Sequence, residues 1–170
     1  MQFSGIFFFF YFIEKLSEYK MLNIKIITVG SVKEEFYRNK INEYMTSISK
    51  HSNASIIELK DESIPSNAGE AAVEDIKKRE GERILSSIDS TDYVVALCID
   101  GRLTNTNGVA SLMSKASADY TGCVCFIIGG SLGLNDAVIR RANYKLSFSR
   151  MTFPHQLMRV MLLEQIDAAL

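Results

Sequence analysis

The hydrophobic and polar positions of the chain predict short strands that alternate with helices. Four β-rich runs stand out, at residues 23–29, 54–59, 93–99 and 123–128. The last two runs are almost continuously apolar, which is typical of strands buried on both faces of a parallel sheet. A fifth, shorter strand is predicted at residues 144–148.

Between these strands, apolar residues recur at the spacing of a helix. The first helix is predicted to follow residues 31–34 (SVKE), which fit a capping box. Gly81 interrupts the second and longest helix, at a cost of about 1 kcal/mol relative to alanine. Weaker helical patterns cover residues 109–118 and 136–142, and a last helix begins near His155. The apolar helical positions are Tyr37, Ile41, Tyr44 and Ile48 in the first helix and Val73, Ile76, Ile84, Leu85 and Ile88 in the second.

This alternation predicts one α/β domain over residues 21–170, with a mostly parallel sheet and helices on both of its faces. The chain of 170 residues is long enough for one proper core. It contains no internal repeat, low-complexity tract or linker that would divide it.

Composition limits the possible function classes. The formal net charge is −1, so we expect no broad basic surface for bare nucleic acid, although a local patch could recognise a folded RNA. The three cysteines lie in apolar runs without zinc spacing, and we interpret them as buried reduced thiols, which suit the cytoplasm. With two histidines in the chain, a metal site is not expected.

Residues 1–20 are interpreted separately from the domain. Their apolar run, residues 3–13, falls short of the ~20 residues that a membrane span requires. It also lacks the basic start and the cleavage site of a secretory signal. We expect the natural start at Met21, with residues 1–20 as translated upstream sequence and no membrane partner. The alternative is an anchor at a membrane surface.

Three predicted strand ends are candidates for ligand binding, because ligands of parallel α/β sheets bind beyond the carboxyl ends of the strands. They are residues 97–101 (LCIDG), 128–133 (IGGSLG) and 149–154 (SRMTFP). The G-G-x-x-G spacing differs from the dinucleotide fingerprint, and a plain tight turn explains it equally well. The coincidence of three such ends favours a nucleoside held by main-chain hydrogen bonds.

The start of the last helix adds two candidate side chains. His155 lies where the helix dipole favours a neutral imidazole, so it is either a general base or a residue that hydrogen-bonds locally. Arg159 follows one turn later on the same face, and we interpret it as functional or interfacial. The helix has almost no polar face, so it is either buried in a large core or packed against another molecule. The basic groups at residues 77–79 and 140–141 are interpreted as solvated helix faces, with phosphate contacts as the alternative.

The sequence from Val124 to Ile166, VCFIIGGSLGLNDAVIRRANYKLSFSRMTFPHQLMRVMLLEQI, resembles the SPOUT superfamily of methyltransferases. It is similar in particular to the small enzymes that form N3-methylpseudouridine in large-subunit (23S) ribosomal RNA. IKIITVG near the start and KREGERIL in the long helix also fit, so the likeness extends from Met21 to about Ile166. The most specific feature is the combination of IGG with LSFS-x-MTFPH.

The resemblance implies a C-terminal trefoil knot and S-adenosyl-L-methionine as cofactor. It implies methyl transfer to N3 of a pseudouridine in 23S rRNA, on the assembled ribosome, by a cytoplasmic homodimer whose site is completed across the interface. A dimer would account for the apolar last helix, with one face on its own sheet and another on the partner. We expect His155 and Arg159 to be the catalytic residues. Carried over residue by residue, the cofactor site consists of Leu97, Gly129, Gly130, Ser149, Arg150, Met151, Thr152, Phe153 and Pro154.

The sequence departs from the family pattern at its end. The resemblance implies Tyr-Arg after the Glu164-Gln165-Ile166 run and then a short tail with Tyr-His and a basic residue, but residues 167–170 are DAAL. We therefore expect this tail to be missing, cofactor binding to survive, and RNA binding and turnover to be affected. One alternative function is a tail-less, catalytically impaired remnant that binds RNA or the ribosome. Another is a generic α/β nucleotide-binding module.

Overall fold

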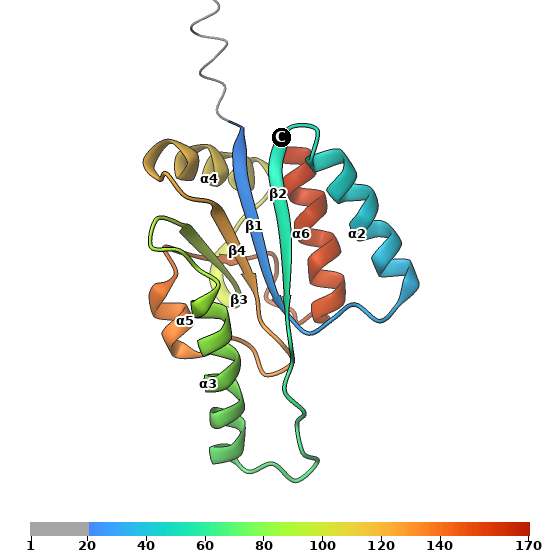
Figure 1. Cartoon of the computed structure of the whole chain (residues 1–170), viewed down its shortest axis with the longest axis vertical. Coiled ribbons are helices and arrows are strands. Elements are labelled where there is room, and N and C mark those ends of the chain that lie inside the picture. The colour runs from blue at the N-terminus through green and yellow to red at the C-terminus, as the bar shows by residue number, and fades with distance from the viewer. Residues whose placement is uncertain (1–20) are drawn as a thin grey trace, which may run out of the picture.

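The computed structural model describes residues 21–170, so the expectations about residues 1–20 and the start at Met21 lie outside the described residues. Strands and helices alternate in one α/β domain, as predicted (Figure 1). The elements are β1 (Leu22–Val29), α2 (Glu35–Ile48), β2 (Ser52–Leu59), α3 (Glu70–Ser86), β3 (Tyr93–Leu103), α4 (Thr106–Asp119), β4 (Val124–Ile128), α5 (Asp136–Arg141), β5 (Tyr144–Ser147) and α6 (His155–Ala169).

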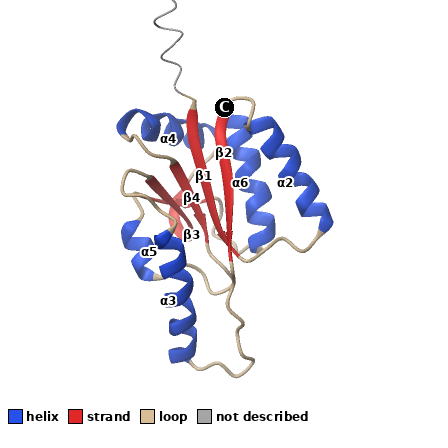
Figure 2. Ribbon diagram, viewed as in Figure 1, coloured by secondary structure: helices blue, strands red, loops and turns tan. Residues whose placement is uncertain are grey.

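Five strands form a parallel sheet in the order β2-β1-β4-β3-β5. The central strand β4 is buried at every residue, as its continuous apolar run predicts. Because all strands run in the same direction, their carboxyl ends lie at the same edge of the sheet (Figure 2). The predicted parallel sheet is therefore confirmed.

Helices cover both faces of this sheet, which is also confirmed. On one face, Ile41 of α2, Met113 of α4 and Leu162 of α6 belong to a single buried cluster. On the other face, Ile84 of α3 and Val138 of α5 belong to a second cluster. Figure 1 shows α2 and α6 side by side, with α3 and α5 across the sheet from them. Helix α6 contacts both α2 and α4. Packing within the domain therefore already buries much of the apolar surface of α6.

The predicted capping box at residues 31–34 is wrong. Helix α2 begins at Glu35, and its N-cap residue Glu34 makes no side-chain cap hydrogen bond. The backbone N–H of Lys33 instead donates to Oε1 of Gln156 on α6, at 3.1 Å, and Val32 is buried in the core. Contacts with a distant helix therefore override the local capping signal.

Strand β3 also differs from its prediction, because it continues past its expected end at residue 99 as far as Leu103. Leu97 and Arg102 both pair with Leu146 of β5, so residues 98–101 bulge out of the ladder. A Cβ atom at Gly101 would lie 2.7 Å from the carbonyl carbon of Leu146. Gly101 therefore permits a close approach of two strands.

A buried ion pair lies at the opposite edge of the sheet, where the strands begin. Nζ of Lys25 lies 2.9 Å from a carboxylate oxygen of Asp92 and 2.9 Å from one of Asp89. Asp92 also accepts a hydrogen bond from the N–H of Cys123, at 2.8 Å. Burial raises the pKa of Asp92, but the hydrogen bonds from Lys25 and from backbone N–H groups outweigh it, so the pKa is lowered.

We expect D92N to lower the free energy of unfolding by about 3 kcal/mol, because it removes the buried counter-charge of Lys25. A carboxyl group with a lowered pKa stabilises the fold while it is ionised. Its contribution is present above the unfolded pKa of about 4 and is lost as the pH falls through the folded value. Urea denaturation at pH 7 and pH 3 measures both effects. E43Q, at the exposed Lys40–Glu43 pair, is the control, and equal behaviour of the two variants would contradict the prediction.

Candidate functional site

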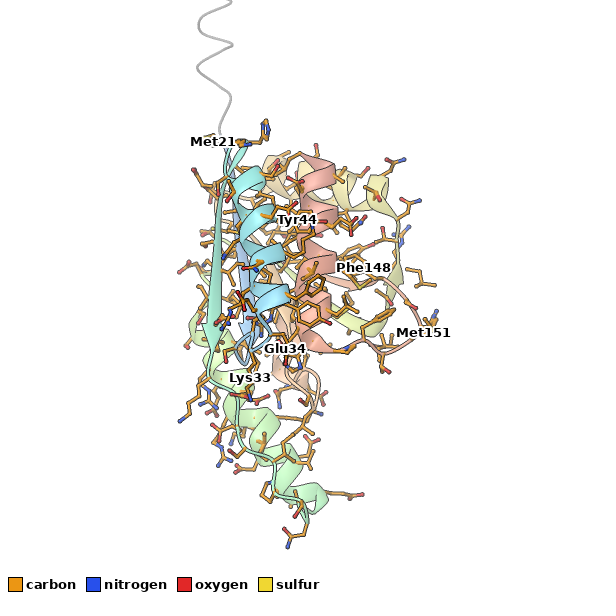
Figure 3. All side chains as sticks on the ribbon, turned by 90° about the vertical axis from the view of Figure 1, so that its right-hand side faces the viewer. Met21, Lys33, Glu34, Tyr44, Phe148 and Met151 are labelled. Carbon is orange, nitrogen blue, oxygen red and sulfur yellow. The ribbon has the colours of Figure 1, made fainter. Side chains whose placement is uncertain are left out.

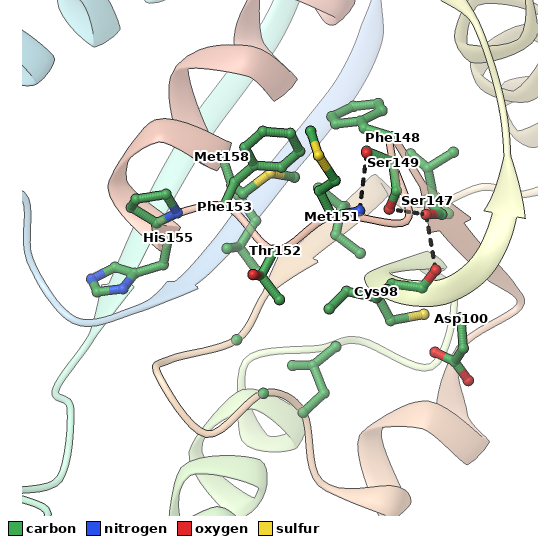
Figure 4. Close-up of a pocket in the computed structure, with 18 of the residues that line it drawn as sticks. Cys98, Asp100, Ser147, Phe148, Ser149, Met151, Thr152, Phe153, His155 and Met158 are labelled. Carbon is green, nitrogen blue, oxygen red and sulfur yellow. Dashed lines mark hydrogen bonds between the residues drawn. The ribbon is translucent and has the colours of Figure 1, made fainter.

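A cavity of about 570 Å³ lies at the carboxyl ends of β3, β4 and β5 (Figure 4). It is the place where ligands of parallel α/β sheets bind. Its walls come from the three strand ends that the sequence singles out and from the first turn of α6. The lining residues are Leu97, Cys98, Ile99, Asp100, Ile128, Gly129, Gly130, Ser131, Gly133, Leu134, Leu146, Ser147, Phe148, Ser149, Met151, Thr152, Phe153, Pro154, His155 and Met158.

The structure brings most of the expected cofactor-site residues together around this cavity. They are Leu97, Gly129, Gly130, Ser149, Met151, Thr152, Phe153 and Pro154. Arg150 is the exception, since its side chain is exposed and does not line the cavity.

The glycine loop after β4 needs glycine for its own shape. Gly133 has a φ of +78°, and its N–H donates to the carbonyl oxygen of Gly130 at 3.1 Å. A Cβ atom at Gly129 would lie 2.9 Å from the carbonyl carbon of Gly133. The three glycines therefore let the loop fold tightly, and a ligand in the cavity can approach the backbone of Gly129 and Gly130 directly.

The loop between β5 and α6 is fixed by its own hydroxyl groups. The Ser147 hydroxyl lies 3.1 Å from the carbonyl oxygen of Ile99 and 2.9 Å from that of Ser149. The N–H of Met151 donates to the Ser149 hydroxyl at 3.0 Å, as Figure 4 shows. Met151 itself is 65% exposed. This loop therefore presents an ordered backbone with one large apolar side chain open to solvent.

Several residues that line the cavity are not among the site residues expected from the sequence. Cys98 and Asp100 stand in the β3 bulge, and Phe148 follows β5. Burial raises the pKa of the Cys98 thiol to about 11, with Asp100 adding to the effect, so the thiol stays protonated at neutral pH. Met158 lies three residues after His155, and this helical spacing could have identified it. The sequence marks residues 97–101 as a candidate strand end but shows no sign of the bulge.

His155 lines one end of the cavity as the first residue of α6, while Cys98 and Asp100 lie at the other end (Figure 4). Burial of the ring and the nearby charge of Arg159 lower the pKa of His155. The imidazole is therefore neutral near pH 7 and able to accept a proton.

Arg159 does not line the cavity. Its side chain is buried, and its guanidinium donates to the carbonyl oxygens of Val29 at 3.0 Å and Gly30 at 2.7 Å. It also forms an ion pair with Glu58 of β2 at 2.6 Å. These contacts tie α6 to the ends of β1 and β2, and they place Arg159 as an anchor next to the site.

The basic groups named from the sequence mostly meet the protein's own groups. Lys77 pairs with Glu74, and Arg79 pairs with Asp75 at 2.8 Å. Arg141 donates to the carbonyl oxygen of Asp89 at 3.0 Å. These contacts support the interpretation of helix surfaces over that of phosphate contacts.

Residues 21–170 contain neither a grouped set of metal ligands nor a membrane-spanning helix. No group of three or more His, Cys, Asp or Glu side chains there is arranged to hold a metal ion. In the same part of the chain, no helix combines the length and the apolar character needed to cross a membrane.

Comparisons with known proteins agree with this architecture. The model of a family described as "Predicted SPOUT methyltransferase" matches residues 22–169. Proteins named "Ribosomal RNA large subunit methyltransferase H" from Bacillus pumilus and Clostridioides difficile are 49% and 48% identical over 148 residues, which cover 87% of this chain and 93% of each relative. A solved structure of a "Probable Methyltransferase" from Bordetella pertussis Tohama I has a TM-score of 0.51 at 14% identity, over 92% of this chain and 99% of that one. This last likeness concerns the fold alone.

We expect R159M to lower the free energy of unfolding by about 3 kcal/mol, because it leaves Glu58 and two buried carbonyl oxygens without their donor. R150M is the matched control, since Arg150 is exposed and should tolerate the same change. Chemical denaturation of both variants measures the difference. Equal stability of R159M and R150M would contradict the anchoring role.

Proposed function

Because the chain belongs to the SPOUT methyltransferase family, we propose that it transfers a methyl group from S-adenosyl-L-methionine to N3 of a pseudouridine in 23S rRNA. The proposed acceptor lies on the assembled ribosome, and the proposed location is the cytoplasm. The names of the relatives at 49% and 48% identity support ribosomal RNA as the substrate.

The observation that carries this proposal is the cavity built from three strand-end loops. Apolar side chains such as Leu97, Ile128 and Leu146 line it and suit the adenine ring. The glycine loop offers backbone N–H and C=O groups at close range, which suits the polar atoms of a nucleoside. When bound, S-adenosyl-L-methionine supplies an electrophilic methyl group. The residues present therefore fit this cofactor.

The proposed chemistry demands little from side chains. The N3–H of a pseudouridine is a weakly acidic imide, and holding it in line with the methyl group in a dry pocket supplies most of the rate. His155 is the proposed general base, since it lines the cavity and its lowered pKa keeps it neutral. Arg159 acts through position, because it fixes the helix on which His155 stands.

We propose a homodimer whose site is completed across the interface. Figure 3 shows Tyr44, Phe148 and Met151 on the side of the molecule that α2 and α6 form. Phe36 of α2 is 71% exposed, and half-buried apolar residues remain on α6. A second copy of the chain would cover such a surface.

A trefoil knot around the glycine loop and the β5–α6 loop belongs to the same proposal. Both loops line one cavity, and β4 lies between β1 and β3 in the sheet. A knotted chain must thread a loop during folding, so slow refolding from the fully denatured state is its expected signature. Complete refolding within milliseconds would speak against it.

We expect the purified protein to bind S-adenosyl-L-methionine saturably, and ATP and NAD not at all, in a calorimetric titration. Light scattering on the same sample should give the mass of a dimer. Ribosomes that lack the methyl group should then accept label from the cofactor, and no transfer should occur to ribosomes already methylated. Binding without transfer would instead favour a catalytically impaired protein of this family that binds RNA or the ribosome, and absence of binding by a folded protein would refute the proposed activity.

We expect H155Q to lower kcat by about 100-fold while it changes the Kd for the cofactor less than about threefold, as for loss of a general base. In the wild type, kcat should fall only at a pH below the ordinary histidine pKa of about 6.5, because the pKa of His155 is lowered. H155Q should lack this limb of the pH profile. H51Q is the control, since His51 is exposed and outside the cavity. A kcat for H155Q that equals that of H51Q would exclude the base role.

A further inference from the structure

The KREGERIL segment of α3 contains a buried carboxylate that the proposed chemistry does not use. Glu80 is 6% exposed, and it does not line the cavity. Gly81, the next residue, is buried as well. Because a buried acid is costly unless it is hydrogen-bonded, its contacts indicate what it does.

Glu80 contacts two loops at once. Its Oε1 accepts a hydrogen bond from the backbone N–H of Glu62, in the β2–α3 loop, at 3.0 Å. Its Oε2 faces Gly130 of the glycine loop, where an added Cβ atom would lie 3.2 Å away. The absence of a side chain at Gly130 therefore leaves the space that the Glu80 carboxylate occupies.

Gly81 meets the other end of the glycine loop. A Cβ atom at Gly81 would lie 2.8 Å from Cβ of Asn135. The Asn135 side chain accepts a hydrogen bond from the N–H of Ala137 at 2.8 Å and so caps α5. Two consecutive residues of α3 thus contact both ends of the loop at residues 129–135, which forms one wall of the cavity.

Glu62, whose backbone N–H bonds to Glu80, is also held to α3 by its own side chain. Glu62 forms ion pairs with Arg83 and, at 3.6 Å, with Arg79. The hydrogen bond from Arg83 lowers the pKa of Glu62, so its carboxylate stays ionised and bound at neutral pH. The β2–α3 loop is therefore bonded to α3, and Glu80 and Gly81 of the same helix pack closely against the glycine loop.

We propose that Glu80 is a positioning residue for cofactor binding. Its carboxylate packs into the space beside Gly130 and thereby keeps the glycine loop in the conformation that binds the cofactor. This inference rests on the proposed function. The carboxylate would contact the side of the loop that faces away from the cavity, and it would not contact the cofactor. Gly81 contributes to the same packing, because its lack of a side chain lets α3 approach Asn135.

The first test compares E80A with E80Q. We expect E80A to raise the Kd for S-adenosyl-L-methionine about tenfold, because it leaves the Glu62 N–H without an acceptor and the loop without its support. E80Q keeps an acceptor of the same shape and should stay within about threefold of the wild type. D92N is the control for general destabilisation, since Asp92 lies at the opposite edge of the sheet, and its Kd should be unchanged. If E80A and D92N raised the Kd equally, or if E80Q were as weak as E80A, the positioning role would be overturned.

The second test is a double-mutant cycle with G130A. An added Cβ atom would press on Glu80 and also on Val29, whose Cγ1 would lie 3.1 Å from it. The rise in Kd caused by G130A should therefore be smaller in the E80A background than in the wild type. Equal rises in both backgrounds would show that the two residues act independently and would refute the proposal.

A third measurement separates this inference from the proposed function. Hydrogen exchange of the unliganded protein should be faster at residues 129–135 in E80A than in E80Q, with α4 unchanged as an internal reference. This readout needs no cofactor. If the wild type failed to bind S-adenosyl-L-methionine, the proposed function would fall while the exchange of the loop would still decide the role of Glu80.

Discussion

The buried guanidinium of Arg159 connects the last helix to the ends of two strands, and the geometry of the site depends on it. Its two bonds to the carbonyl oxygens of Val29 and Gly30 satisfy backbone groups where β1 leaves the sheet. Its ion pair with Glu58 adds the end of β2. Because His155 begins the same helix, these bonds act together with the packing of α6 on α2 and α4 to fix where the imidazole and the preceding Pro154 lie relative to the sheet.

The cavity that results is made mainly of backbone and apolar side chains. Gly129 and Gly130 form one wall, and the Ser147–Pro154 segment forms another. A site of this kind stabilises a bound molecule through shape and main-chain hydrogen bonds rather than through a charged catalytic set. It also makes loop position critical, since a shift of about 1 Å can cost ~100-fold in rate. The contacts of Arg159 and Glu80 with the segments next to the cavity therefore concern the position of these loops.

Much of the fold and part of the site could be predicted from the sequence. The apolar run of β4 and the helical spacing of Ile76 and Ile84 are local patterns, and both elements form as expected. The parallel sheet then follows, and with it the meeting of three strand ends at one edge. The predicted capping box at residues 31–34 does not form, because a long-range contact replaces the local one. The Lys33 N–H is bonded to Gln156, 123 residues away in the chain.

The sequence by itself determined the order of strands and helices, the glycine loop and the family to which the chain belongs. Only the tertiary structure decided what individual polar residues do. Arg159 bonds to a carbonyl oxygen 130 residues earlier in the chain, and Glu80 reaches the N–H of a residue 18 positions before it. The bulge at residues 98–101 likewise brings Gly101 against the backbone of Leu146, a residue far along the chain. Secondary structure depends on neighbours along the chain, whereas the partner of a buried polar group depends on which distant segments the packed core brings within hydrogen-bonding distance.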